Sequence, residues 1–187
     1  MIEPKRVELG PYNGIPHLLR PVACDTYNAF SVLSYAEEEM RNRYELFSQY
    51  GVRKLESYNE KVSEAKKLAR IIIVIDEYME MIFNSQKGVE DLIASFARLG
   101  RAAGVHLVLA TQSPSSNVIT GNIKANIPCR ASFTVVDWRE SKTILDRTGA
   151  ERLLGSGDML YSTGDSAFPN GGLSISGSCS GILYFRR

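Results

Sequence analysis

Apolar residues along this chain form short continuous runs that are separated by stretches with helical spacing. Residues 71–75 are four isoleucines and one valine. This run is apolar on both faces and too short for an isolated helix, so it predicts a central parallel strand. Similar runs predict strands at 105–110, 130–136 and 158–161. The pattern therefore places several buried strands at the core of the molecule.

Helices are predicted between these strands. A long helix is expected from Thr26, which can cap it, to a stop at Gly51, because apolar residues recur at helical spacing. Further helices are expected at 55–68, 88–104 and 139–147. Strands that alternate with helices predict an α/β fold, with a parallel sheet covered by helices on both faces.

Polar side chains occur where two of the strands and one of the helices meet loops. Asp76 and Glu77 end the isoleucine-rich strand, Gln112 follows the strand at 105–110, and Asp137 with Glu140 resembles a capping box. The carboxyl ends of parallel strands meet at one edge of the sheet, where ligands bind in open α/β folds. Many strands end in an acid that only caps the next helix, but an acidic pair here also has the pattern of a Walker B element.

Such a pair has a defined chemistry. An Asp at the end of the strand can hold Mg²⁺, usually through water, and the following Glu can orient or deprotonate the water that attacks a γ-phosphate. Asp76 and Glu77 are therefore candidate catalytic residues, with Asp76 as the candidate metal ligand.

Composition excludes several classes of protein. The 187 residues are 44% hydrophobic and 23% charged, which is typical of a globular domain, and the net charge of +1 gives no argument for nucleic acid beyond a local patch. Three widely spaced cysteines, Cys24, Cys129 and Cys179, favour reduced thiols in a cytoplasmic setting. No apolar run approaches the roughly 20 residues that span a bilayer.

Two regions differ from the rest of the chain. Met1 and Ile2 begin abruptly, as though inside a strand, so the first part of the domain is expected to be missing. Residues 162–187 are rich in Gly and Ser and have no period, which predicts a loosely ordered tail after a domain at 1–161.

A series of motifs carries a family resemblance. In order they are IEPKRVEL, GIPHLL, IIIVIDE, ARLGRAAGVHLVLATQ, VITGNIKANIP and GAERLLGSGDMLY. The series resembles the motor domain of the FtsK/SpoIIIE family of DNA translocases, over about residues 1–161. The resemblance implies a RecA-like P-loop NTPase fold, ATP and Mg²⁺ as cofactors, double-stranded DNA as partner and a homo-oligomeric, hexameric ring. It also implies a cytoplasmic motor in chromosome partition, within a family whose full-length members are often anchored in the inner membrane.

The resemblance assigns roles to single residues. Asp76 and Glu77 match the Walker B pair, Gln112 matches a polar sensor of the γ-phosphate, and Arg101 matches an arginine finger that reaches a neighbouring subunit's nucleotide. From the residues alone, the alternative for Gln112 is a loop amide bonded to backbone. Arg101 near the end of a helix is equally explained by the helix dipole.

The segment 138–142 matches a DNA-contacting pore loop. Arg139 and Lys142 are candidate phosphate contacts, and Ser141 is a weaker candidate donor. The alternative is a solvated helix N-terminus. Ser113 stands where the family usually has Arg, so one DNA contact that the family makes is not expected here.

A phosphate-binding loop is not present in these residues. The chain contains no G-x-x-x-x-G-K-[ST] motif and no Gly-Lys pair, so nothing is expected to cradle the β- and γ-phosphates. This polypeptide alone is expected to hydrolyse ATP poorly or not at all. The family also places the P-loop strand in the middle of its sheet, so we expect a gap, or direct pairing, between the strands at 105–110 and 130–136.

Three functions remain open at this point. The chain is part of an ATP-driven DNA translocase, or a naturally short subunit that joins a ring or DNA without hydrolysis, or part of a related secretion-type motor that moves protein. The segments GIPHLL and GVR favour a DNA motor over a secretion motor.

Overall fold

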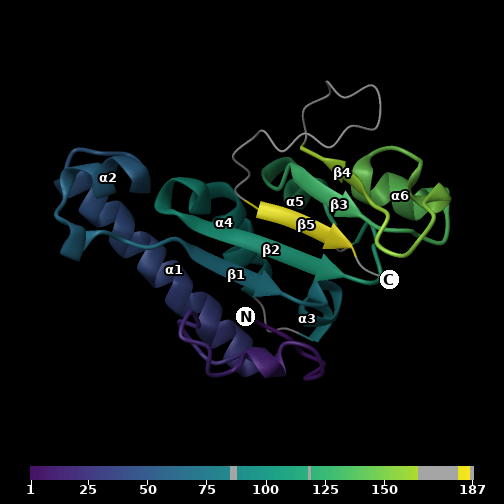
Figure 1. Ribbon diagram of the computed structural model, residues 1–187, viewed down its shortest axis with the longest axis horizontal. Coiled ribbons are helices and arrows are strands. Elements are labelled where there is room, and N and C mark those ends of the chain that lie inside the picture. The colour runs from purple at the N-terminus through teal and green to yellow at the C-terminus, as the bar shows by residue number, and fades with distance from the viewer. Residues whose placement is uncertain (85–87, 118, 164–180, 186–187) are drawn as a thin grey trace.

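The molecule is built on one five-stranded sheet (Figure 1). The computed structural model describes residues 1–84, 88–117, 119–163 and 181–185. In spatial order the strands are β1 (Ile71–Ile75), β2 (Val105–Thr111), β5 (Gly181–Phe185), β3 (Cys129–Ser132) and β4 (Leu160–Ser162). Neighbouring strands are parallel except for β4, which is antiparallel to β3. The predicted α/β fold with a largely parallel sheet is confirmed.

The helices either precede β1 or lie between strands along the chain. They are α1 (Thr26–Gln49), α2 (Leu55–Lys61), α3 (Tyr78–Asn84), α4 (Val89–Ala103), α5 (Gly121–Asn126) and α6 (Trp138–Leu145), with 3-10 turns at Gly10–Tyr12, Glu64–Lys66 and Ala150–Arg152. The predicted long first helix is confirmed, but its cap is Asp25 rather than Thr26. The Asp25 carboxylate accepts the backbone N–H of Asn28, and Thr26 is the first helical residue.

The hydrophobic core lies between β1 and β2 and the helices α1 and α4. Alternate residues of β2 are buried, so its inward side chains, such as Leu107 and Leu109, pack toward helix residues that include Ile93 and Phe96. Burying each such side chain stabilises the fold by about 1.5–3 kcal/mol. Within the described residues, the opposite face of this part of the sheet is less covered, since Ile72 is 62% exposed and no labelled helix lies in front of β1 and β2 (Figure 1).

Helix α4 approaches β2 unusually closely at its last turn. A Cβ on Gly100 would lie 2.4 Å from the carbonyl oxygen of Val105, so only glycine fits there. Gly104 then ends the helix with φ of +72°, and its N–H bonds back to the carbonyls of Gly100 and Arg101. This tight helix-to-strand turn fixes where β2 begins, and hence where its carboxyl end delivers Thr111.

The first residues of the chain extend the sheet beyond β1. Ile2 forms an isolated parallel bridge with Ile75, because its N–H donates to Val74 O at 2.8 Å and its carbonyl accepts the N–H of Asp76 at 2.9 Å. On its other side, Ile2 bridges to Ala23. Met1 and Ile2 were expected to be strand-like, and this pairing agrees with that expectation.

The centre of the sheet corrects two predictions. Between β2 and β3 there is neither a gap nor direct pairing, because β5 lies between them and pairs with both in parallel. The expectation of a loosely ordered tail is accordingly wrong for Gly181–Phe185, while residues 164–180 and 186–187 lie outside the described part. Two inner edges with unpaired backbone groups would cost about 1–3 kcal/mol for each unsatisfied group, and the apolar run GILYF can fill the slot.

Smaller differences concern boundaries and cysteines. Strand β3 ends at Ser132 rather than at residue 136, and α2 ends at Lys61 rather than at residue 68. Cys129 is disulfide-bonded and Cys24 is a free thiol, so the expectation of reduced thiols is wrong for Cys129. Cys129 is in register with Ile182, so the end of the chain runs beside it, which spacing in the sequence could not indicate. Within the described residues, no helix has both the length and the apolarity that a membrane crossing requires.

Candidate functional site

Glu77 occupies the turn between β1 and α3 in an unusual backbone conformation. Its φ is +54°, in the left-handed region that non-glycine residues rarely adopt, and only 6% of the residue is exposed. A backbone of this kind costs on the order of 1–3 kcal/mol and persists only where surrounding contacts impose it. The sheet thus holds a buried carboxylate in a fixed, strained position at the carboxyl end of β1.

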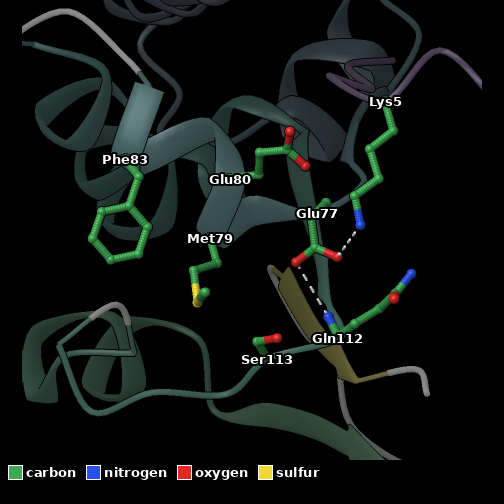
Figure 2. Close-up of a pocket in the computed structure, with 7 residues that line it drawn as sticks. All are labelled: Lys5, Glu77, Met79, Glu80, Phe83, Gln112 and Ser113. Atoms are coloured by element: carbon green, nitrogen blue, oxygen red, sulfur yellow. Dashed lines mark hydrogen bonds and ion pairs between the residues drawn. The ribbon is translucent and has the colours of Figure 1, made fainter.

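Both oxygens of the Glu77 carboxylate are engaged. Oε1 accepts the Thr111 hydroxyl at 2.7 Å and the backbone N–H of Gln112 at 3.3 Å, while Oε2 is 3.3 Å from the ammonium of Lys5. Figure 2 shows Glu77 between Lys5 and Gln112. The prediction that the acidic pair and Gln112 meet at one edge of the sheet is confirmed by these contacts.

A pocket of about 320 Å³ opens beside this carboxylate. One side is polar and the other is apolar, and its lining residues are Lys5, Glu77, Met79, Glu80, Phe83, Gln112 and Ser113 (Figure 2). Lys5 is the single cation among these lining residues. A ligand in this pocket would meet the carboxylates of Glu77 and Glu80. The one ammonium group, that of Lys5, is already paired with Glu77.

The positions of Asp76 and Gln112 support their predicted roles less directly than the position of Glu77 supports its own. Asp76 is half-buried and its backbone N–H donates to Ile2, but it is not among the residues that line the pocket. Gln112 reaches Glu77 through its backbone N–H, and its exposed side chain points away from that carboxylate in Figure 2. The sensor role of the Gln112 amide thus remains a prediction.

Arg101 lies far from the other candidates. It is an exposed residue in the last turn of α4, next to the amino end of β2, whereas Gln112 follows the carboxyl end of the same strand. Seven strand residues span about 20 Å. Arg101 therefore does not reach the Glu77 of its own chain, which is the arrangement that a finger acting on a neighbouring subunit requires.

The candidate DNA-contacting residues lie at the start of α6. Asp137 caps this helix by accepting the N–H groups of Arg139 and Glu140, and Glu140 accepts the N–H of Val136, so the predicted capping box is confirmed in its essentials. Arg139 is exposed and lies over the ring of Trp138, 5.6 Å from its centroid. Two apolar side chains, Val136 and Trp138, are exposed beside it.

The two remaining candidates on α6 differ from each other. Lys142 is exposed, as a phosphate contact requires. Ser141 is fully buried, and its hydroxyl donates to Arg147 O at 2.8 Å and accepts the N–H of Ala150 at 3.1 Å. The structure thus argues against Ser141 as a DNA contact, because this side chain ties α6 to the following loop.

Two residues of the site were not predicted from the sequence. Thr111 is buried at the end of β2, and its position directly before Gln112 is a signal that could have identified it. Lys5 lies 72 residues before Glu77, and nothing in the spacing indicated that they meet. Next to the site, burial and the charge of Glu90 raise the pKa of Tyr78 above its usual range.

The residues present fit one half of a nucleotide site. Asp76 and Glu77 are of the type that associates with Mg²⁺ and with the attacking water. The described residues contain no group of three or more His, Cys, Asp and Glu side chains that could hold a metal. No G-x-x-x-x-G-K-[ST] motif occurs in the 187 residues.

Known structures share this architecture. The pCW3 conjugation coupling protein TcpA, solved as a monomer with ATPγS, is 32% identical with a TM-score of 0.69, and the match covers 76% of this chain and 43% of that one. The cytoplasmic domain of the type VII secretion ATPase EccC of Thermomonospora curvata has a TM-score of 0.66 at 22% identity, over 76% of this chain and 18% of that chain, which shows the fold alone. The fold is therefore that of P-loop ATPase motor domains.

Sequence comparisons define the family. The model of the FtsK/SpoIIIE family matches residues 1–116. The DNA translocase FtsK of Caldanaerobacter subterraneus subsp. tengcongensis is 56% identical over 161 residues, covering 86% of this chain and 23% of that protein. The DNA translocase SpoIIIE of Bacillus subtilis is 48% identical over 169 residues, covering 86% of this chain and 22% of that protein. The chain belongs to the FtsK/SpoIIIE family, and it spans about a quarter of the length of these relatives.

Proposed function

We propose that this chain supplies the catalytic-acid half of the nucleotide site, and a DNA-contacting helix, in an ATP-driven motor that translocates double-stranded DNA. The observation that carries the proposal is the buried Glu77 carboxylate, held in a strained turn by Thr111, Gln112 and Lys5. A protein retains such strain where function needs a fixed side chain. Relatives of this chain are named DNA translocases, which supports DNA as the substrate. The role in chromosome partition is proposed from the family resemblance.

The proposed roles of Glu77 and Arg101 rest on side-chain position, and those of Asp76 and Gln112 rest on the family resemblance. Glu77 orients the attacking water and accepts its proton, because its carboxylate lines the pocket and is fixed through both oxygens. Asp76 associates with Mg²⁺, and Gln112 monitors the γ-phosphate from the exposed end of β2. Arg101 acts on the nucleotide of the next subunit in a hexameric ring, since it lies at the other end of β2 from its own Glu77.

DNA contact is proposed for the exposed cations of α6. The side chains of Arg139 and Lys142 are both exposed, whereas that of Ser141 is buried. Guanidinium and ammonium groups contact phosphates without reading the base sequence. This surface therefore suits a motor that moves along any duplex.

A second candidate function is favoured by β5. The chain completes the middle of its own sheet with Gly181–Phe185, the place that the family gives to its P-loop strand. A chain that closes its own sheet without a phosphate-binding loop fits a short, non-hydrolysing subunit that joins a ring or DNA. Isothermal titration of the 187-residue chain with ATP tests both functions together, because micromolar ATP binding by this chain alone would contradict both. The completed motor described next separates them.

The test of the first function uses a completed motor. This is a fusion in which the segment that precedes the matching region of the Caldanaerobacter relative is placed before Met1, prepared with and without residues 163–187, because an added central strand competes with β5. We expect the version without these residues to hydrolyse ATP and to be stimulated by duplex DNA. A fusion that forms rings and binds ATP, yet shows no hydrolysis with or without DNA, overturns the motor proposal and favours the second function.

A further inference from the structure

The loop that carries Lys5 is organised around a buried carboxylate. Glu3 is only 1% exposed, and its two oxygens accept the backbone N–H groups of Val7, Glu8 and Leu9. The Val7 and Leu9 bonds are 2.6 and 2.7 Å long. A buried carboxylate needs such donors, since its burial is costly without them. Glu3 therefore closes residues 3–9 into a fixed loop.

This loop is attached directly to the strand that ends in the catalytic acid. Ile2, one residue before Glu3, exchanges backbone hydrogen bonds with Val74 and Asp76 of the β1 segment. Lys5 projects from the loop toward the pocket, and its ammonium lies 3.3 Å from Oε2 of Glu77 (Figure 2). The loop and the carboxylate thus share one rigid connection through the sheet edge.

Lys5 completes a two-sided hold on Glu77. Thr111 and Gln112 bind one carboxylate oxygen, and Lys5 is the partner of the other. Without Lys5, the remaining charged neighbour among the lining residues is the carboxylate of Glu80, which repels Glu77. We propose that Lys5 is a positioning residue that fixes the rotation of the Glu77 carboxylate, and that Glu3 sets the loop from which Lys5 reaches it.

The alternative is an ordinary surface ion pair, which contributes little. Two observations favour positioning. The Glu77 side chain is 7% exposed, so the pair is half-buried although the Lys5 side chain is 42% exposed. The loop also holds Arg6 at a φ of +59°, a conformation that the Glu3 bonds must sustain. Because the Lys5 side chain is 42% exposed, its removal should alter the site and leave the fold intact.

The inference rests on the proposed function, and its test compares three variants of the completed motor. Lys5→Met removes the charge, Lys5→Arg keeps it, and Arg6→Met removes a neighbouring charge that pairs with Asp25 instead of Glu77. We expect Lys5→Met to lower kcat by about tenfold to a hundredfold, since small misplacements of a reacting group have effects of that size. KM for ATP should change by less than about twofold, because an orienting contact acts on the chemical step. Lys5→Arg should restore most of the rate, and Arg6→Met should match the parent.

A measurement on the 187-residue chain gives a second, activity-independent readout. The backbone amide of Gln112 donates to Glu77, so Lys5→Met should shift its NMR resonance and speed its hydrogen exchange, with an unchanged melting temperature. Arg6→Met should leave this amide as it is. Failure of the two ideas can be told apart. If Glu77→Gln leaves ATPase intact, the proposed function fails; if Glu77→Gln abolishes it while Lys5→Met has the parent rate and amide signal, the positioning role alone is refuted.

Discussion

Thr111 and Glu77 are joined by a hydrogen bond of 2.7 Å that links the carboxyl ends of β2 and β1. Both residues are buried, at 1% and 6% exposed. The hydroxyl donates to the carboxylate and at the same time accepts the N–H of Ser113 at 3.3 Å. The bond therefore connects the strained turn after β1 with the loop after β2, which are the two segments that carry the acid and the predicted sensor.

Replacing Thr111 by Val should destabilise the chain. The change keeps the shape of the side chain but removes the donor to a buried carboxylate, which costs about 1–3 kcal/mol of unfolding free energy. Thr143→Val is the matched control, since its hydroxyl bonds only to Arg139 O within one helix, and about 0.5 kcal/mol or less is expected there. Urea denaturation measures both values. Equal losses of unfolding free energy in the two variants would show that the Thr111–Glu77 bond stabilises the chain no more than a bond within one helix.

Deleting residues 163–187 should disrupt the middle of the sheet. The deletion removes β5, so the inner edges of β2 and β3 lose the partner that satisfies their backbone groups. We expect faster hydrogen exchange across β2 and β3 and loss of a single cooperative melting transition. Deletion of residues 186–187 alone is the control and should leave both unchanged. Full protection of β2 and β3 in the longer deletion would show that β5 is dispensable.

Asp146 should make stability depend on pH in the acid range. Burial acts to raise its pKa, but hydrogen bonds from Lys124 and Arg130 outweigh this and hold the pKa below its ordinary value. A lowered folded-state pKa gives a contribution that is fully present above the unfolded pKa, near 3.9, and is lost as pH falls through the folded value. The left-handed φ of +60° at Asp146 also suits Asn, so Asp146→Asn removes the charge with little backbone strain.

The measurement for Asp146 is the free energy of unfolding of both proteins between about pH 2 and pH 7. The parent should be more stable than Asp146→Asn above about pH 5, and the difference should shrink steadily below about pH 4. A difference that stays constant across this range would show that the Asp146 charge is not linked to folding. The pairing with Lys124 also agrees with a structural role for this lysine.

The sequence could predict those features of the fold and site that depend on a short run of residues. The strand at 71–75, the acids after it and the polar end of β2 are read from short runs, and their meeting at one sheet edge follows from parallel geometry. Lys5 could not be assigned, because its contact with Glu77 depends on the path of the loop around Glu3. Composition alone predicted a loosely ordered tail, but Gly181–Phe185 pairs with β2 and β3 as a strand.

The candidate DNA-contacting segment, residues 138–142, shows the same limit of sequence-based prediction. Residues 138–142 all lie in the first turns of one helix, so their spacing alone does not show which of them are exposed. The structure places Arg139 and Lys142 outside and turns Ser141 inward, where Arg147 and Ala150 occupy its hydroxyl. A family match gives a segment, and side-chain direction decides which of its residues can act.

The most direct test of the account is the duplex-DNA-stimulated ATPase rate of the completed motor carrying Glu77→Gln. The matched control is Glu80→Gln, a carboxylate that lines the same pocket. The account predicts that Glu77→Gln abolishes turnover while ATP binding and ring assembly persist, and that Glu80→Gln retains most of the rate. A Glu77→Gln motor that hydrolyses ATP at the parent rate would contradict the claim that this buried, strained carboxylate activates the attacking water.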